Sequence, residues 1–299
     1  MLEAVHLSRR YGDFVAVDDV SFSIDPGEVV GLLGHNGAGK TTIMKMLTAY
    51  LEPSAGQVRI DGWDVIADPE AAHRLIGYLP ESLPVYPELT VADYLAYVAR
   101  LRGLDPAAVV PPAVRATDLQ GRLLDPIATL SRGFRQRVGV AQAILHKPRF
   151  LILDEPTNGL DPSQTQHMRT LIRQLAEQAT VILSTHIMQE VKAVCDRALI
   201  LRQGKLVVDE RLADLVHTSA LRVRASGVDV SSVLTGLAAV KQKTADDGAW
   251  LVEVSGSVED GVASIAKALV SAGADIREIA PVQQDLEMVF RRVNEEVAA

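Results

Sequence analysis

The sequence predicts an α/β protein in which a mainly parallel sheet carries an inserted helical segment, followed by a small α+β domain. Three observations predict this fold class. Short apolar runs typical of buried strands alternate with helical patterns over residues 1–215. Helical patterns alone occupy about 88–145. From 216 to 299 strands and helices restart in a new order, and 299 residues suit one large and one small domain.

The beginning of the chain supplies the first strands. "VAVDDVSFSID" alternates apolar and polar residues, which indicates a half-buried strand, and "GEVVGLLG" is apolar enough for a buried one. The second strand leads through "GHNGAGKTT" into "IMKMLTAYL", whose apolar spacing is helical. "GQVRIDGWDV" predicts a strand and a turn. In the inserted segment, Thr90 with Asp93 predicts a helix start, "LDPAAVVPPAV" a proline-rich loop and "RQRVGVAQAIL" another helix.

Strands return after the insertion and complete the sheet. "RFLILDEP" and "TVILST" predict buried strands, each followed by a helix, "PSQTQHMRTLIRQLAEQA" and "IMQEVKAVCD". "RALIL" and "KLVVD" flank "RQGK" as a hairpin. In 216–299 the predicted order is β-α-β-β-α-β, the ferredoxin-like arrangement, with a last helix at "DLEMVFRRVNEE". This domain could dimerise, bind a regulator or brace the first domain.

Composition narrows the classes of function. A net charge of −8 argues against a nucleic-acid partner. Cys195 is the single cysteine, which fits a reducing cytosolic compartment, and we expect it to fill a helix face. "MLEAVHLSRRYG" lacks the apolar run of a signal peptide, and no stretch approaches the ~18 apolar residues of a membrane span. Work at a membrane would therefore need a partner on a separate chain.

A phosphate-binding loop is the strongest motif. "GHNGAGKT" fits G-x-x-x-x-G-K-[ST] between a predicted strand and helix. Its glycines let backbone N–H groups surround a phosphate, Lys40 brings a charge to the β- and γ-phosphates, and Thr41 offers a hydroxyl to Mg²⁺. We expect Thr42 to begin the helix that faces the anion. The predicted nucleotide-binding residues are Gly34, His35, Asn36, Gly37, Ala38, Gly39, Lys40, Thr41 and Thr42.

Two further stretches carry candidate chemistry. "FLILDE" predicts a buried strand that ends in Asp154, a candidate Mg²⁺ ligand, and Glu155, a candidate general base. Without the phosphate-binding loop upstream, these two residues could be surface carboxylates at a strand end. "LSRGFRQR" places Ser131 and Gly133 at a predicted helix start, which suits an anion. From the residues alone, a capped helix with a solvated basic face is the favoured interpretation of "LSRGFRQR".

In this order, "GHNGAGKTT", "LSRGFRQR", "LILDEPTNGLDP" and "LSTH" resemble the ATP-binding cassette (ABC) proteins over roughly residues 2–215. The resemblance implies the P-loop NTPase fold of an ABC cassette and two cassettes, a homodimer or a pair, that sandwich ATP head to tail. The signature of one cassette would then close on the nucleotide of its partner. The implied signature residues are Ser131, Arg132, Gly133 and Gln136.

The resemblance assigns roles to four other residues. It implies that Tyr11 stacks on adenine, although Tyr11 could be an ordinary strand-end tyrosine, and that His186 contacts the γ-phosphate and orients water as a catalytic partner of Glu155. Asp161 matches the loop that communicates across the dimer. Glu81 stands where the family usually has a glutamine that contacts Mg²⁺, so the implied metal residues are Thr41, Glu81 and Asp154.

Departures from the family pattern favour one branch. Arg132 replaces a glycine and Phe134 a glutamine in the signature, and Arg132 could contact the γ-phosphate or face solvent. These departures, Glu81 and "PVYPELTVADYL" resemble the exporter branch of the ABC-2 type. The resemblance therefore implies an ATPase subunit, with ATP and Mg²⁺ as cofactors, at the cytoplasmic face of the membrane. It would drive a permease on a separate chain, seated near residues 81–94. A soluble ABC ATPase acting on ribosomes or DNA, or an importer subunit, are the alternatives.

Overall fold

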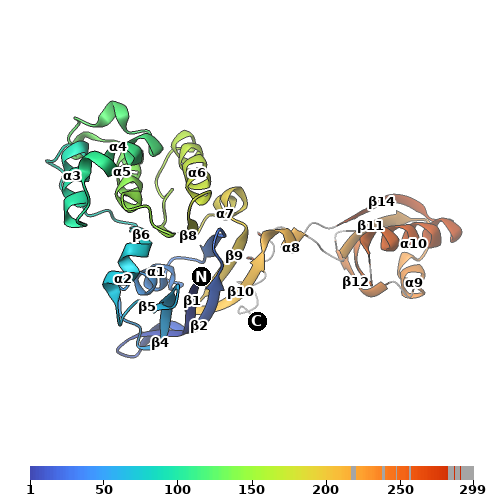
Figure 1. Cartoon of the computed structure of the whole chain (residues 1–299). Coiled ribbons are helices and arrows are strands. Elements are labelled where there is room, and N and C mark those ends of the chain that lie inside the picture. The colour runs from blue at the N-terminus through green and yellow to red at the C-terminus, as the bar shows by residue number, and fades with distance from the viewer. Residues whose placement is uncertain are drawn as a thin grey trace. The chain divides into compact units, whose positions relative to one another are not determined.

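The computed structural model describes residues 1–216, 220–237, 240–246, 248–255 and 257–281, together with Leu286 and Phe290. The chain divides into two compact units, the first containing Met1–Leu212 and the second Ala213–Arg292 (Figure 1). Each unit has its own buried apolar core.

A six-stranded sheet forms the centre of the first unit. Its strand order is β10-β9-β3-β8-β7-β6, and all neighbouring pairs are parallel except the edge pair β10–β9. The predicted mainly parallel sheet is therefore confirmed. Because parallel strands share a direction, the loops after β3, β7 and β8 emerge at the same edge of the sheet. The strands are β3 (Val29–Leu33), β6 (Ile76–Leu79), β7 (Phe150–Asp154), β8 (Thr180–Thr185), β9 (Arg197–Arg202) and β10 (Lys205–Arg211).

Helix α1 packs against this sheet and fixes the loop that precedes it. Ile43, Met44 and Leu47 of α1 are fully buried in one cluster with Leu32 of β3 and Ile152 of β7. Each such side chain stabilises the fold by about 1.5–3 kcal/mol relative to an exposed one. The helices around the sheet are α1 (Lys40–Leu47), α2 (Pro69–Leu75), α6 (Pro162–Ala176) and α7 (Met188–Val194).

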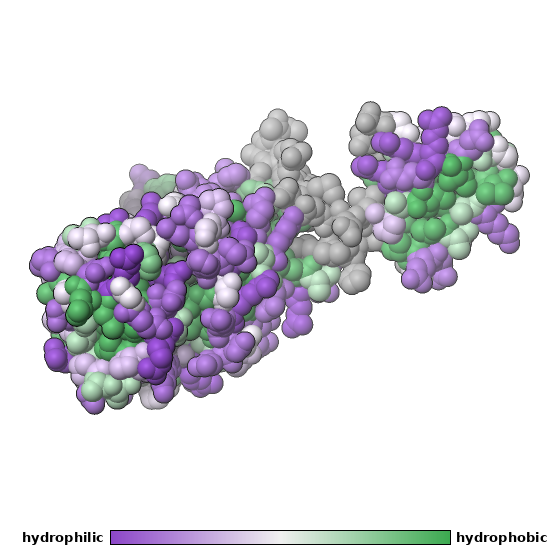
Figure 2. All heavy atoms as spheres, turned by 90° about the horizontal axis from the view of Figure 1, so that it is seen from above, coloured by the Kyte–Doolittle hydropathy of each residue, from purple (hydrophilic) through white to green (hydrophobic). Residues whose placement is uncertain are grey.

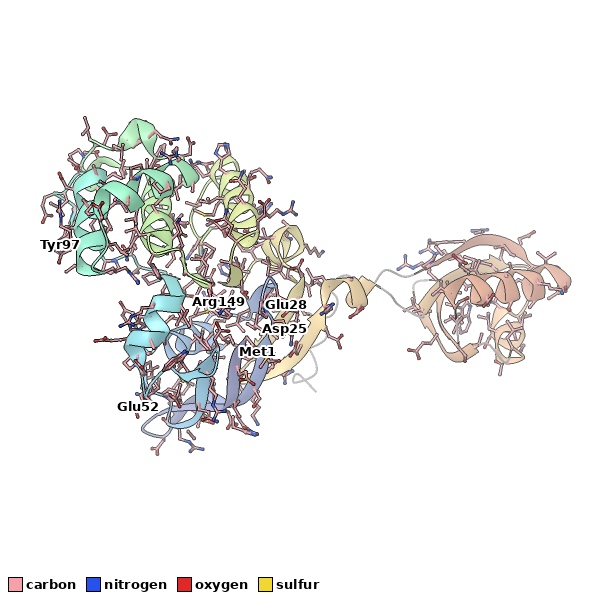
Figure 3. The ribbon with its side chains drawn as sticks, in the orientation of Figure 1. Met1, Asp25, Glu28, Glu52, Tyr97 and Arg149 are labelled. Atoms are coloured by element: carbon pink, nitrogen blue, oxygen red, sulfur yellow. The ribbon has the colours of Figure 1, made fainter. Side chains whose placement is uncertain are left out.

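A second, antiparallel sheet of the first unit was not predicted. Its order is β2-β1-β4-β5, with strands β1 (Leu2–Tyr11), β2 (Phe14–Ile24), β4 (Ala55–Ile60) and β5 (Trp63–Asp64). Alternating burial identifies such strands in a sequence, but it does not say which strands pair. Arg149, labelled in Figure 3, forms an ion pair with Asp61 between β4 and β5, and so ties this sheet to the segment before β7.

The inserted segment is helical, as predicted, with one correction. Thr90 caps the first helix by accepting a hydrogen bond from the Asp93 N–H at 3.1 Å. The prediction of a proline-rich loop is wrong, because residues 106–116 form a helix that Asp105 caps. Burial of Ala113 and Val114 between the neighbouring helices offsets the hydrogen bonds that two internal prolines remove. The helices are α3 (Val91–Leu101), α4 (Pro106–Ala116) and α5 (Arg132–Ile144), with 3₁₀ turns at Gln120–Arg122 and Ile127–Thr129.

The second unit is a small α+β body. Its antiparallel sheet has the order β12-β13-β11-β14, and the elements follow the predicted order along the chain. The ferredoxin-like class stays a prediction. The expected last helix lies outside the described residues except for Leu286 and Phe290, which are buried. The elements are α8 (Leu212–Val216), β11 (Ala220–Ser226), α9 (Val230–Thr235), β12 (Val240–Asp246), β13 (Ala249–Val254), α10 (Val258–Ser271) and β14 (Asp275–Pro281).

Hydrophilic side chains, interspersed with smaller hydrophobic areas, cover the face of the first unit seen in Figure 2. Within the part of the chain that the structure describes, no helix has both the length and the apolar character to cross a membrane. Cys195 is buried at the end of α7, where burial raises the pKa of its thiol. It therefore serves packing, as expected.

Gly56 provides a test of the packing between β1 and β4. Its φ is +84°, and a Cβ there would lie 2.2 Å from the His6 carbonyl oxygen. We expect Gly56→Ala to lower the free energy of unfolding by about 3 kcal/mol, from backbone strain plus the clash. Gly62 is a matched control because its φ is +85° with open space around it, so Gly62→Ala should cost about 1 kcal/mol. Urea unfolding measures both, and equal losses would show that the clash is absent.

Candidate functional site

The motif residues meet at one edge of the six-stranded sheet. The loop after β3, the end of β7 and the residue after β8 surround a cavity of about 500 Å³. The residues that line this cavity are Tyr11, Phe14, Ala16, Asn36, Gly37, Gly39, Lys40, Thr41, Thr42, Glu81, Glu155, Asn158 and His186. The signature residues and Asp161 do not line it.

The glycine-rich loop takes the shape that a phosphate cradle needs. Gly39 caps α1 with a φ of +104°, and a Cβ on it would lie 2.6 Å from the Ala16 carbonyl oxygen. Gly37 also has a positive φ, of +82°. Helix α1 begins at Lys40, so the expected start at Thr42 is two residues late. Its first turn aims free N–H groups and a partial positive charge at the cavity.

Lys40 is held in a fixed position beneath this loop. Its side chain is 6% exposed, and Nζ donates to the carbonyl oxygens of Gly34 at 2.7 Å and His35 at 3.3 Å. Gly34 and His35 do not line the cavity, and their carbonyl groups support the lysine. Ala38 also stays out of it and packs beside Gly34, where a Cβ on Gly34 would lie 2.8 Å away. The ammonium is thus oriented before any anion binds.

Glu155 lies between two cavity residues. Its Oε1 is 3.4 Å from Lys40 Nζ, and its Oε2 is 3.0 Å from His186 Nδ1. The side chain is buried, and its φ of +50° is unusual for a residue other than glycine. Ser184 holds this backbone, since its hydroxyl accepts from the Glu155 N–H at 3.0 Å. Strained backbone that the surroundings hold in place is typical of functional sites.

Asp154 has an oxygen that the protein leaves without a partner. Its Oδ1 accepts hydrogen bonds from the hydroxyls of Ser184 and, at 3.4 Å, Thr41, whereas the buried Oδ2 has none. Burial is the main cause that raises the pKa of this carboxyl, with the charges of Glu81 and Glu155 adding to it. A nearby cation would reverse this penalty, so the donors fit Mg²⁺.

Protein groups alone do not complete a metal site here. Among the residues that the structure describes, no three His, Cys, Asp or Glu side chains gather as a metal cluster. Mg²⁺ commonly takes one or two protein ligands and completes its shell with phosphate oxygens and water. Glu81 lies in the same cavity, but its Oε1 accepts a hydrogen bond from Asn158 Nδ2 at 3.4 Å.

Two aromatic side chains also line the cavity. Tyr11 ends β1 and pairs with Phe14 of β2; the two side chains are 48% and 63% exposed. The guanidinium of Arg9 lies 4.8 Å from the centre of the Tyr11 ring. Exposed rings of this kind are suited to stacking on a flat base. Phe14 was missed in the sequence, where only its place in "YGDF", beside a turn, gave a signal.

The sequence reasoning also missed Ser184 and Asn158. Ser184 contacts both carboxylate residues of "LILDE", and Asn158 joins the cavity wall to Glu81. Both lie in quoted motifs, "LSTH" and "PTNGLDP". The available signals were the polarity of Ser184 near the end of a buried strand and the position of Asn158 in the loop that follows another.

The signature residues lie outside the nucleotide cavity of their own chain. Ser131 caps α5 by accepting from the Phe134 N–H at 3.4 Å, so the predicted helix start is confirmed. Arg132 and Gln136 line a neighbouring cavity of about 420 Å³, which shares Glu81 with the first. Asp161 caps α6 by accepting from the Gln164 N–H at 2.9 Å. One chain therefore presents the P-loop and the signature in separate places.

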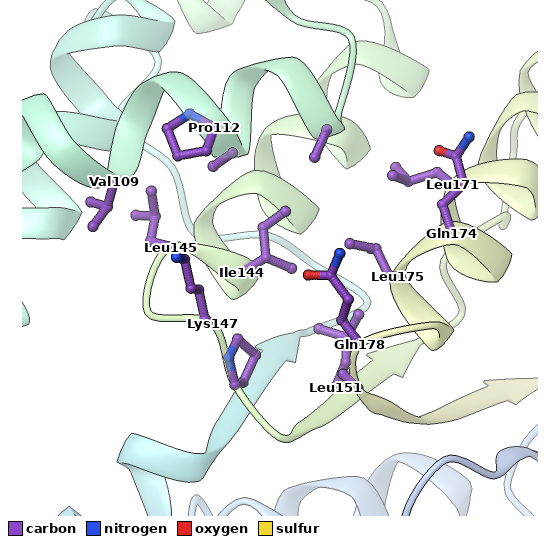
Figure 4. Close-up of a pocket in the computed structure, with 14 residues that line it drawn as sticks. Val109, Pro112, Ile144, Leu145, Lys147, Leu151, Leu171, Gln174, Leu175 and Gln178 are labelled. Carbon is purple, nitrogen blue, oxygen red and sulfur yellow. The ribbon is translucent and has the colours of Figure 1, made fainter.

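An apolar cavity of about 260 Å³ lies between α4, the end of α5 and α6 (Figure 4). Its lining includes Pro112, Leu145, Leu171 and Leu175, and none of the candidate nucleotide, metal, catalytic or signature residues. It is separate from the chemistry described above.

Sequence comparisons agree with these motifs. The family model "ABC transporter" matches residues 17–158. The ABC transporter ATP-binding protein YdbJ of Bacillus subtilis (strain 168) is 32% identical over 95% of this chain and 92% of its own length. NatA, an ABC transporter ATP-binding protein of the same organism, is 37% identical over 73% of this chain and 92% of its length. The bacitracin transport ATP-binding protein BcrA of Bacillus licheniformis is 35% identical, over 69% and 68%.

A solved structure shows the same fold. An ATP-binding subunit of an ABC transporter matches with a TM-score of 0.65 and 35% identity, covering 72% of this chain and 91% of the other.

Proposed function

This chain belongs to the ATP-binding proteins of ABC transporters, and from that premise we propose that it powers an exporter through a permease on a separate chain. ATP binding and hydrolysis come with the family. Export is supported by the names of relatives, which include a Nod factor export ATP-binding protein that is 35% identical over 71% of this chain. The observation that carries the ATPase part of the proposal is the joint placement of Lys40, Glu155 and His186 around one cavity.

Each residue has a part in hydrolysis. The P-loop N–H groups and Lys40 bind the β- and γ-phosphates, and Tyr11 stacks on the adenine. Glu155 accepts the proton of the attacking water, and His186 holds the carboxylate and contacts the γ-phosphate. Thr41 and Asp154 would hold Mg²⁺, which neutralises phosphate charge when bound. Bound phosphates would compete with Glu155 for the charge of the Lys40 ammonium, which would free the carboxylate for water.

The active unit is a pair of cassettes. One chain places no donor from "LSRGFRQR" in its own nucleotide cavity, so the γ-phosphate lacks contacts on its open side. A partner chain can supply Ser131, Gly133 and the start of α5. Two chains arranged head to tail would bury two ATP molecules, with Asp161 near the junction.

The permease would dock beside Glu81, in the segment that leads to α3. Tyr86 and Tyr97 are exposed there with ring centres 5.6 Å apart, and aromatic side chains are enriched at protein interfaces. Docking there would place the chain at the cytoplasmic face of the membrane. The second unit, with its ferredoxin-like order of elements, would serve as an accessory domain.

A mild-detergent pull-down of the tagged chain from its own cells tests this role. A co-purifying protein with several membrane spans is the expected result. Recovery of ribosomal or DNA-associated proteins alone would contradict transport and leave the ATP chemistry intact. A substrate-capturing protein of an importer would contradict only the direction.

Ser131→Ala tests the exchange of signatures. We expect kcat to fall by about 10- to 100-fold while the ATP affinity of the monomer changes less than about twofold, since Ser131 meets only the partner's nucleotide. Steady-state phosphate release and isothermal titration measure the two quantities. Removing a helix cap costs about 1 kcal/mol, so Thr90→Ala, which uncaps α3, is the matched control with normal turnover. Equal losses of turnover and affinity would place the signature on its own chain's nucleotide.

A further inference from the structure

Two residues that depart from the family pattern converge on the same turn, Asn158–Gly159. Glu81 accepts a hydrogen bond from Asn158 Nδ2 at 3.4 Å. Arg132 reaches the next residue, Gly159, from the start of α5. This turn lies in the short segment between Glu155 and Asp161. It therefore connects the proposed general base, Glu155, to the residue that caps α6, Asp161.

The contact between Arg132 and Gly159 is close. A Cβ on Gly159 would lie 2.4 Å from Arg132 Nη1 and 2.6 Å from Cζ, and φ at Gly159 is +70°. Any side chain at 159 would displace the guanidinium. Within its own chain, Arg132 is exposed, which is one of the two positions that the sequence left open, and its guanidinium also lies against the backbone of Gly159.

The neighbouring signature residue is packed in the same way. A Cβ on Gly133 would lie 2.5 Å from Gln164 Oε1 in the first turn of α6. The start of α5 thus rests on both the turn and the helix that follows it. On the other side, Glu81 lines the nucleotide cavity together with Asn158, and also the cavity that Arg132 lines.

We propose that Arg132 is a positioning residue that fixes the signature to the Asn158–Gly159 turn, so that Ser131 and Asp161 meet the partner as one surface. Through Asn158, Glu81 links this surface to the nucleotide bound in the same chain. The state of one ATP site would then bias the signature that the chain offers to the other site. This inference rests on the proposed head-to-tail pair.

The test compares two arginines of the same helix in the Glu155→Gln background, where hydrolysis does not consume the ATP. Arg132→Ala removes the contact, whereas Arg135→Ala removes an equal charge that lines the same cavity from the next turn. We expect Arg132→Ala to raise the ATP concentration for half-maximal dimerisation, measured by analytical ultracentrifugation, at least about fivefold. Arg135→Ala should change it less than about twofold, and neither should alter nucleotide affinity of the monomer.

Cooperativity gives a readout that loss of folding would not mimic. With Glu155 intact, the Hill coefficient for ATP should fall from near 2 towards 1 in Arg132→Ala and stay unchanged in Arg135→Ala. Gly159→Ala should impair dimerisation less in the Arg132→Ala background than alone, because its methyl group then has space. Identical behaviour of the two arginine variants, or additive effects with Gly159→Ala, would overturn the inference. A Glu155→Gln parent that stays monomeric would overturn the head-to-tail pair and this inference with it.

Discussion

Glu155→Gln is expected to reduce ATP turnover by about 10²- to 10⁴-fold, the usual contribution of a general base. The carboxylate is buried between Lys40 and His186, at 3.4 Å and 3.0 Å, on a backbone that Ser184 holds. Glutamine keeps the size and can bond to both neighbours but does not accept the proton of water. Single-turnover phosphate release measures the loss. Glu177→Gln, at the exposed end of α6, is the control with normal turnover.

The same variant should keep ATP bound. Nucleotide contacts from the P-loop and Tyr11 remain, so we expect affinity within about threefold of the parent and accumulation of an ATP-bound dimer. Gel filtration with ATP and Mg²⁺ detects the dimer. Turnover reduced less than tenfold would assign the base to another group, and a monomer under these conditions would contradict the sandwich.

Local sequence patterns were sufficient to predict many of the strands and helix caps of the first unit. Buried strands such as "FLILD" and "TVILST" are apolar runs that fit a parallel sheet, and their carboxyl ends meet at one edge. This geometry made the joint position of Lys40, Asp154 and His186 predictable. The caps by Thr90 and Ser131 also follow from short-range chemistry, since each hydroxyl meets an N–H three residues later.

Other features depended on tertiary contacts that no local pattern records. The prolines of α4 disfavour a helix, but burial of Ala113 and Val114 stabilises the helix that forms. The pairing of β1 with β4 joins segments about fifty residues apart, which alternation of burial cannot specify. Arg132 is exposed, one of the two positions that the sequence left open, but its packing on Gly159 joins two segments that no local pattern connects.

Lys40→Ala should lower ATP affinity by about 10²- to 10³-fold, because it removes a charge–phosphate contact of about 3–4 kcal/mol in a partly enclosed cavity. The variant also leaves Glu155 buried without its cationic neighbour, so the free energy of unfolding should fall by about 2–3 kcal/mol. A second substitution can separate these two effects. Adding Glu155→Gln removes the stranded charge and should restore most of the stability without restoring ATP binding.

The two effects of Lys40→Ala are measured by isothermal titration with ATP and by urea unfolding without nucleotide. Lys45→Ala is the matched control, since Lys45 is an exposed lysine of the same helix and should leave both quantities unchanged. If Lys40→Ala/Glu155→Gln stayed as unstable as Lys40→Ala, the lysine would act on stability through the Gly34 and His35 carbonyls instead. Retained affinity in Lys40→Ala would show that backbone N–H groups alone hold the phosphates. The expected pattern, rescue of stability but not of binding, would show that Lys40 has two roles: it neutralises the base in the empty site and the phosphates in the filled one.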